Sequence, residues 1–128
     1  MSFWDENPPV WFTPDEFACR CGCGLNAISE QTVRKLDSLR AAVGHPVVIT
    51  SGSRCPAWNK RSGGAMGSKH LPQSDGYSYA ADLALTGPYA YRALRVALDL
   101  GFPGVGVAKS FIHLDDSPDR KHGTLWTY

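Results

Sequence analysis

Glycine and proline interrupt this chain throughout its length, and they limit the kind of fold that it can form. The 128 residues include 13 glycines and 9 prolines. Because both residue types disfavour the interior of helices and strands, we expect short elements, many loops and a modest hydrophobic core. A chain of this length is expected to form one domain, which here covers residues 1–128.

Composition and charge exclude several classes of protein. Hydrophobic residues make up 43% and charged residues 20% of the chain, which is ordinary for a globular protein and excludes disordered and fibrous classes. The formal net charge is only +1, so the chain lacks the positive charge that binding to nucleic acid requires. Its apolar runs are too short to span a membrane. Residues 1–7 carry acids and no basic region, which predicts no secretory signal and synthesis in the cytoplasm.

Helix and strand signals follow one another along the chain. The segment Thr-Pro-Asp-Glu at residues 13–16 is typical of a helix start, with a Thr cap and Pro in the first turn. A second helix is predicted from the Ser29 cap through Val43, ended by Gly44. Strands are predicted at residues 46–50, 79–85, 105–108 and 111–114, a surface loop at 51–67, and a helix at 88–100. We therefore expect a small α+β domain whose N-terminal helices pack on a mainly antiparallel sheet.

The four cysteines allow three interpretations. Cys19, Cys21 and Cys23 are each separated by one residue, whereas paired cysteines of a structural zinc site are usually separated by two. One of them could form a disulfide with Cys55 in an oxidising compartment. The third interpretation is that they are small, buried apolar residues. The sequence leaves metal, disulfide and free thiols open, and it assigns the cysteines no catalytic role.

Two histidines and one aspartate are the best candidates for chemistry. His70 ends a flexible, polar segment, and His113 alternates with Asp115 so that both lie on one face of a predicted strand. Asp82 lies in an apolar strand, where a carboxylate is costly unless it is paired or binds a metal. Two histidines and one carboxylate are a ligand set typical of catalytic zinc. The alternative is a hydrogen-bonded aspartate near two ordinary histidines.

Five short segments occur in a specific order. They are Phe-Ala-Cys-Arg-Cys-Gly-Cys-Gly at 17–24, Ile-Thr-Ser-Gly-Ser-Arg at 49–54, Ser-Lys-His-Leu at 68–71, Ala-Ala-Asp-Leu at 80–83 and Phe-Ile-His-Leu-Asp at 111–115. Their order resembles that of the zinc D-Ala-D-Ala carboxypeptidases of the M15 peptidase family, particularly its small phage and bacterial members. The resemblance implies that His70, Asp82 and His113 hold Zn²⁺.

The spacing of the ligands departs from the family pattern. The family places the aspartate about seven residues after the histidine, whereas Asp82 follows His70 by twelve. An insertion in a loop is tolerable, because the entropy of loop closure grows slowly with length. It makes Asp75 a rival ligand. We prefer Asp82, because Ala-Ala-Asp-Leu fits the motif whereas Ser-Asp-Gly around Asp75 is typical of a turn.

The general base also departs from the pattern. Many relatives have a glutamate three residues before the last ligand, where this chain has Ser110. Asp115 and Asp116 are the nearest carboxylates. Asp115 shares a strand face with His113, so it is a candidate for the catalytic base and equally a candidate for orienting the His113 ring.

The resemblance also implies substrate-binding residues. Arg54 matches an arginine that clamps the terminal carboxylate of the substrate, and its alternative role is a loop-anchoring ion pair. Ser68 could bind the substrate backbone or simply belong to a turn. Aromatic side chains could line the cleft or belong to the core; they are Trp58, Tyr77, Tyr79 and Trp126.

The resemblance implies a zinc peptidase that cleaves the stem peptides of peptidoglycan. It would act as a monomer, either as a D,D-carboxypeptidase or as an endolysin-type endopeptidase. Without a secretory signal it would reach the cell wall after release or delivery, as a phage-encoded or periplasmic protein. The alternatives are a non-catalytic, zinc-containing module that binds the cell wall, and a structural component of a virion.

Overall fold

The computed structural model describes residues 2–128, and within this range it contains five helices and one five-stranded sheet. The helices are α1 (Phe3–Glu6), the 3-10 helix η1 (Pro14–Phe17), α2 (Glu30–Val43), α3 (Pro56–Arg61) and α4 (Gly87–Asp99). The strands are β1 (Ile49–Ser51), β2 (Ala80–Leu83), β3 (Gly104–Val107), β4 (Ile112–Asp115) and β5 (Thr124–Thr127). None of the helices in residues 2–128 has the length and hydrophobicity needed to cross a membrane.

The sheet is mixed but mainly antiparallel. Its strand order is β1-β2-β4-β3-β5, and every neighbouring pair is antiparallel except β3 and β5. The sequence analysis placed no strand in the polar tail, where β5 lies at the edge of the sheet. Its four residues, Thr-Leu-Trp-Thr, do not alternate between apolar and polar, so they lack the pattern that identifies a half-buried strand. In the structure they are exposed or half-buried. The predicted α+β class is confirmed.

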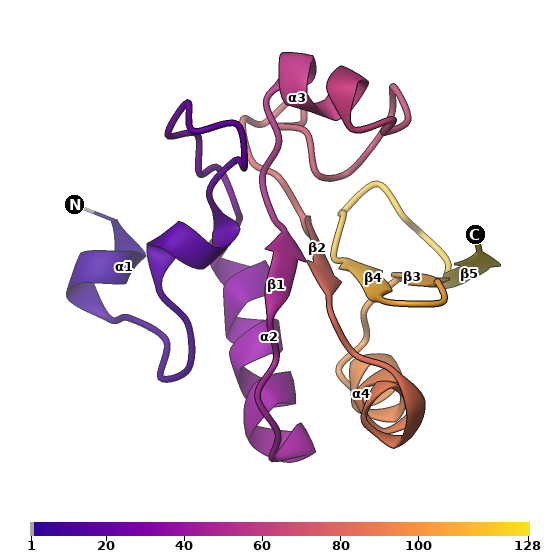
Figure 1. Cartoon of the computed structure of the whole chain (residues 1–128). Coiled ribbons are helices and arrows are strands. Elements are labelled where there is room, and N and C mark those ends of the chain that lie inside the picture. The colour runs from indigo at the N-terminus through magenta and orange to yellow at the C-terminus, as the bar shows by residue number, and fades with distance from the viewer. Residues whose placement is uncertain (1) are drawn as a thin grey trace.

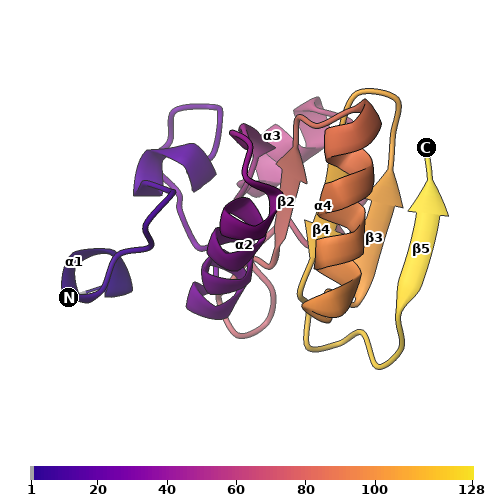
Figure 2. The ribbon, with the colours of Figure 1, turned by 90° about the horizontal axis from the view of Figure 1, so that it is seen from below.

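Two helices cover one face of the sheet. Figures 1 and 2 show α2 and α4 side by side on this face, while α3 lies on the opposite side. Alternate strand residues such as Leu83, Val105 and Leu114 belong to the hydrophobic core with α2 and α4. Because side chains alternate along a strand, their neighbours in sequence are left for the face that α2 and α4 do not cover.

Helix α2 forms as its sequence predicts. The Ser29 hydroxyl oxygen accepts a hydrogen bond from the Thr32 N–H, which satisfies one of the free donors of the first turn. Val33, Leu36 and Leu39 lie on one stripe and are fully buried. The helix ends at Gly44, whose φ of 67° is left-handed.

The predicted loop at residues 51–67 contains a short helix. Cys55 caps α3 by accepting a hydrogen bond from the Trp58 N–H, and Pro56 occupies the first turn. The six residues of α3 are too few to give a recognisable hydrophobic period, which explains why the sequence alone predicted only a loop. Helix α1 escaped prediction for the same reason, since it has only four residues.

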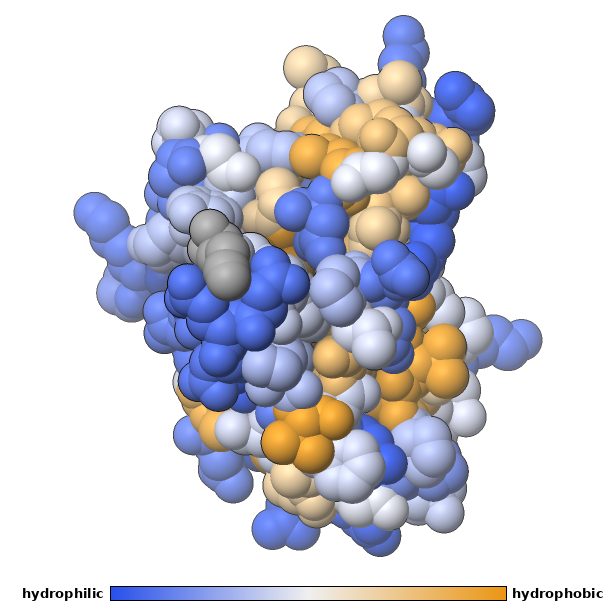
Figure 3. All heavy atoms as spheres, turned by 90° about the vertical axis from the view of Figure 1, so that its left-hand side faces the viewer, coloured by the Kyte–Doolittle hydropathy of each residue, from blue (hydrophilic) through white to orange (hydrophobic). Residues whose placement is uncertain are grey.

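The surface beside the N-terminal segment is polar for the most part. Figure 3 shows this side of the molecule, where several hydrophobic patches are separated by hydrophilic side chains. The hydrophobic core lies between the sheet and the two long helices, and it continues beneath the N-terminal segment through Phe12 and Phe17.

Candidate active site

The three predicted ligands come together on the face of the sheet opposite to α2 and α4. Asp82 on β2 lies directly opposite His113 on β4 in the strand register, and His70 approaches from the segment before β2. Asp82 Oδ1 lies 3.2 Å from His70 Nε2 and 3.0 Å from His113 Nδ1. All three residues are buried, and their ligand atoms lie within 4.8 Å of one another.

The second nitrogen of each imidazole is held by an oxygen. His70 Nδ1 lies 2.7 Å from the carbonyl oxygen of Gly52, and His113 Nε2 lies 2.9 Å from Asp115 Oδ2. These acceptors assign the ring protons to the outer nitrogens, so a neutral His70 and His113 both turn a lone pair toward Asp82. Two lone pairs and a carboxylate repel one another unless a proton or a cation lies between them. The donor set and its supporting oxygens therefore fit a zinc ion.

The contacts with the two histidines lower the pKa of the Asp82 carboxyl. Burial alone would raise the pKa of the Asp82 carboxyl. Hydrogen bonds with His113 and His70 outweigh burial and hold that pKa well below its usual value. Asp82 therefore stays ionised, which is the form that binds a metal cation.

The ionisation of His113 shifts in the opposite direction. Burial lowers the pKa of its imidazole, but hydrogen bonds with Asp115 and Asp82, and then their charges, outweigh burial and raise it. Two carboxylates on opposite sides of one ring thus favour positive charge at His113.

Asp75 lies outside this group. Its carboxylate accepts hydrogen bonds from the Tyr77 N–H, at 2.9 Å, and from the Tyr79 hydroxyl. The bond from Tyr79 is the main cause of a lowered pKa of Asp75. Gly76, with a φ of 88°, completes the turn that the tripeptide predicted. The inserted residues form a loop, and it is Asp82 that reaches the histidines.

Asp115 lies behind His113 and is fully buried. Besides His113, it contacts Arg120, whose Nε and Nη2 lie 2.6 Å from Oδ1 and 3.1 Å from Oδ2. Burial raises the pKa of Asp115, but its bonds to His113 and Arg120 lower it more. Both oxygens are therefore engaged, which is the geometry of a residue that orients His113.

Two residues near Asp115 are Arg120, which the sequence did not single out, and Asp116, which it offered as a second candidate base. Arg120 was missed by the sequence analysis, because it lies in a charged tail where no local pattern marks it. Asp116, the other acid considered as a base, forms an ion pair with Lys35 at 2.6 Å and is not among the described residues that line the cavity beside the histidines.

Glycines on β3 make room for these side chains. Gly104 lies opposite Asp115, and a Cβ on it would lie 2.4 Å from Asp115 Oδ1 and 2.6 Å from Arg120 Nε. Gly106 lies opposite His113, and a Cβ on it would lie 2.5 Å from the Trp126 ring nitrogen. The Gly-Val-Gly-Val segment thus places glycine under the site and valine toward the helices.

The candidate ligands open into a cavity of about 570 Å³. The segment 62–70 forms one wall, and Phe111, Trp126 and Tyr128 contribute aromatic surface. Of the aromatic residues considered from the sequence, only Trp126 is among the described lining residues; Trp58, Tyr77 and Tyr79 lie elsewhere. Ser68 lines the cavity, and its hydroxyl accepts a hydrogen bond from the His70 N–H at 3.2 Å.

Arg54 lines the same cavity and is anchored on three sides. Its Nε donates to Ser51 Oγ at 2.9 Å, its Nη1 to Asn59 Oδ1 at 3.2 Å and its Nη2 to Asp82 Oδ2 at 3.4 Å. A guanidinium has five N–H donors, so two remain after these three bonds with residues that the structure describes. Arg54 is thus both a loop anchor and a source of two unused donors beside a candidate ligand.

Comparison with known proteins identifies the family of this chain. The sequence model of the family described as Peptidase M15 matches residues 10–115, a range that includes all three candidate ligands and Arg54. No curated protein matches the chain. Since the matched range covers most of the chain, the protein belongs to the peptidase M15 family.

Proposed function

We propose that this protein is a zinc-dependent D,D-carboxypeptidase that removes a terminal D-residue from the stem peptides of bacterial peptidoglycan. The observation that carries the proposal is the pair of unused Arg54 donors in the same cavity as His70, Asp82 and His113. A carboxypeptidase needs a group that binds the free carboxylate of its substrate close to the reacting carbonyl. An endopeptidase has no such requirement.

His70, Asp82 and His113 would hold the zinc ion. Two neutral imidazoles and one carboxylate leave such a site with a net charge of about +1, counting Zn²⁺ as +2. When bound, the ion supplies Lewis-acid chemistry by polarising the scissile carbonyl and the attacking water. The carbonyl of Gly52 and the carboxylate of Asp115 keep the two rings turned toward the ion.

Arg54 would bind and orient the substrate. A carboxylate can accept two parallel hydrogen bonds from a guanidinium, which fixes its direction as well as its position. The contacts from Ser51 and Asn59 hold the Arg54 guanidinium in place before the substrate arrives, so little side-chain entropy is lost on binding. Ser68, on the wall of the cavity, would contact the substrate backbone.

Asp115 would position His113 rather than act as the base. This assignment rests on its complete burial and its two bonds to Arg120. Asp115 and Asp82 are nevertheless the only carboxylates among the described residues that line the cavity. If a carboxylate accepts the proton of the attacking water, it is therefore Asp115, after release of Arg120.

The residue in the exposed turn between β3 and β4 favours a second candidate function, that of a non-catalytic binding module. Ser110 occupies it, at the position where many relatives carry a glutamate. A chain without that glutamate could keep the metal and bind stem peptides without cleaving them. This protein would then be a non-catalytic module that binds the cell wall.

One experiment separates these functions. The zinc-loaded protein is incubated with a synthetic stem pentapeptide that ends in D-Ala-D-Ala, and free D-Ala is measured by mass spectrometry. Release of D-Ala, absent from a His113→Ala control, supports the carboxypeptidase. Cleavage at an internal bond would indicate an endopeptidase. Binding of the peptide without any product would indicate a binding module.

The cell-wall substrate has consequences for where the protein acts. We propose that the protein acts as a monomer. We propose that it meets peptidoglycan after release or delivery, as a phage-encoded or periplasmic protein.

A further inference from the structure

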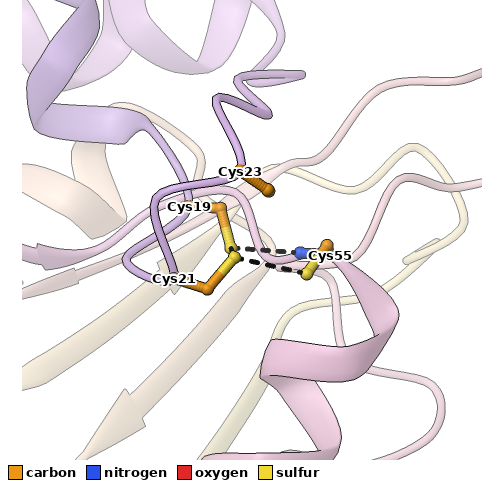
Figure 4. A group of neighbouring side chains, drawn as sticks. All are labelled: Cys19, Cys21, Cys23 and Cys55. Carbon is orange, nitrogen blue, oxygen red and sulfur yellow. Dashed lines mark hydrogen bonds between the residues drawn. The ribbon is translucent and has the colours of Figure 1, made fainter.

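The N-terminal loop brings three cysteines to a fourth one far away in sequence. Cys19, Cys21 and Cys23 lie in this loop, and Cys55 caps α3 (Figure 4). One sulfur atom from each lies within 4.8 Å of the other three. We propose that these four cysteines bind a structural zinc ion as thiolates, at a site separate from the histidine and aspartate site.

The distances between the sulfur atoms fit four ligands of one ion. Zinc–sulfur bonds of about 2.3 Å in a tetrahedron place the sulfur atoms about 3.8 Å apart. Cys19 Sγ lies 3.4 Å from Cys21 Sγ, which in turn lies 3.7 Å from Cys55 Sγ. These separations are far longer than the bond of about 2.05 Å in a disulfide. All four sulfur atoms also form one group rather than two isolated pairs.

The conformation of the loop and the contacts of Arg20 help to hold this arrangement. Gly22 and Gly24 each have a φ of 85°, a left-handed conformation that lets the loop turn back after Cys21 and again after Cys23. Arg20, between Cys19 and Cys21, donates to the carbonyl oxygens of Glu16, at 2.8 Å, and Ile49, at 2.6 Å. The loop is thus tied to the sheet, and its cysteines are left to face Cys55.

Backbone N–H groups also point at two of the sulfur atoms. The Cys55 N–H donates to Cys19 Sγ, and the Trp58 N–H donates to Cys55 Sγ, each at 3.4 Å. Such donors stabilise negative charge on sulfur and orient a thiolate, as hydrogen bonds around metal ligands generally do. The site would be closed, with four protein ligands and no open position, which is the arrangement of a structural zinc.

The binding step changes protonation but not oxidation state. Four S–H protons go to the solvent, four zinc–sulfur bonds form, and no electrons are transferred. The ion would join the N-terminal loop to the segment before α3. Arg54 precedes Cys55 directly, so the ion would fix the backbone next to the residue that lines the active-site cavity.

Metal analysis of the full chain tests the proposal. The protein is purified under reducing conditions, and the number of zinc ions per chain is measured by inductively coupled plasma mass spectrometry. We expect His113→Ala to retain one zinc ion per chain and the double variant His113→Ala, Cys23→Ser to retain none. Cys23 is exposed, so its replacement should leave the fold intact. A His113→Ala protein that is folded, fully reduced and free of zinc would overturn the proposal.

Cobalt provides a second measurement that does not depend on any variant that might unfold. Wild-type protein loaded with Co²⁺ should show strong near-ultraviolet absorption from sulfur-to-cobalt charge transfer, which nitrogen and oxygen ligands do not produce. Cys23→Ser should weaken this band, whereas Met66→Leu, which changes an exposed sulfur outside the cluster, should leave it unchanged. Absence of the band in reduced wild-type protein would contradict the site. Because His113→Ala affects only the other site, failure here is distinct from failure of the proposed function.

Discussion

Asp82 and His113 face each other across the β2–β4 pair, with Oδ1 of the carboxylate 3.0 Å from Nδ1 of the ring. The register of two antiparallel strands fixes this relationship, and His70 then completes the group from a loop. The rigid part of the candidate site is therefore built into the sheet.

Zinc binding at this group should depend on Asp82 and not on Asp75. We expect Asp82→Ala to lose the zinc ion of the active site, because it removes the carboxylate between the two histidines. Asp75→Ala should keep that ion, because within residues 2–128 the Asp75 carboxylate bonds only to its own loop. Isothermal titration calorimetry of each variant with zinc checks both expectations. Loss of zinc in Asp75→Ala with retention in Asp82→Ala would reverse the choice of ligand.

The metal-free protein should lose stability as the pH rises above neutrality. The pKa of His113 is raised above its ordinary value of 6.5, so its contribution to the free energy of unfolding is fully present below about pH 6.5. That contribution is lost as the pH rises through the folded-state pKa. Thermal unfolding of chelator-treated protein, compared with His113→Gln between about pH 6 and pH 9, measures this difference.

Zinc should reverse this dependence, because protons compete with the ion for the same nitrogen. The stabilisation by added zinc is therefore expected to increase over the pH range in which the metal-free protein weakens. Asp82 and Asp115 affect stability only at acidic pH. Their pKa values are lowered from 3.8, so their contributions to the free energy of unfolding are lost only as the pH falls through those lowered values. A zinc stabilisation that did not vary with pH would argue against His113 as a ligand.

Two of the three candidate ligands could be singled out from the sequence because their signals were local. Strand alternation placed His113 and Asp115 on one face, and an isolated carboxylate in an apolar strand singled out Asp82. What the sequence could not show were contacts made only after folding. Arg120 reaches Asp115 from the tail, and Cys55 meets Cys19 across 36 residues. No local pattern of residues encodes either contact.

The elements missed by the sequence analysis share a different cause. Helix α3 has too few residues to show the helical period of apolar residues. Strand β5 is mostly exposed, and its residues do not alternate between apolar and polar. Both nevertheless matter for the site. The segment after α3 forms one wall of the cavity, and Trp126 on β5 contributes to another.

Arg54 gives a prediction about substrate class. Arg54→Lys should strongly raise KM, or lower kcat, for peptides that end in a free D-residue, because lysine cannot form the two-pronged contact. A peptide amidated at its C-terminus should be a poor substrate for the wild-type protein. Steady-state kinetics with the acid and the amide test this pair of expectations. Equal rates on both would argue for an endopeptidase.

Gly104 tests whether close packing supports the site. Gly104→Ala would place a methyl group within 2.4 Å of Asp115 Oδ1, so either Asp115 or Arg120 must shift. We expect a loss of about 1–3 kcal/mol in the free energy of unfolding, as for other overpacked sites. Zinc affinity should fall as well. Gly123→Ala, where a Cβ meets no atom within 4 Å, is the control. Unchanged stability and affinity in Gly104→Ala would contradict the packing argument.

Asp115→Asn distinguishes positioning from catalysis. If Asp115 orients His113, the change should weaken zinc binding by about 10–100-fold while most of the rate returns at saturating zinc. If Asp115 is the base, the protein should bind zinc but lose about 10²–10⁴-fold in kcat, and the acidic limb of its pH–rate profile should move or vanish. We expect the first result, because Arg120 engages both oxygens of a fully buried carboxylate. The deciding measurement is kcat of Asp115→Asn with zinc in excess, and a large loss that persists there would assign the base to Asp115.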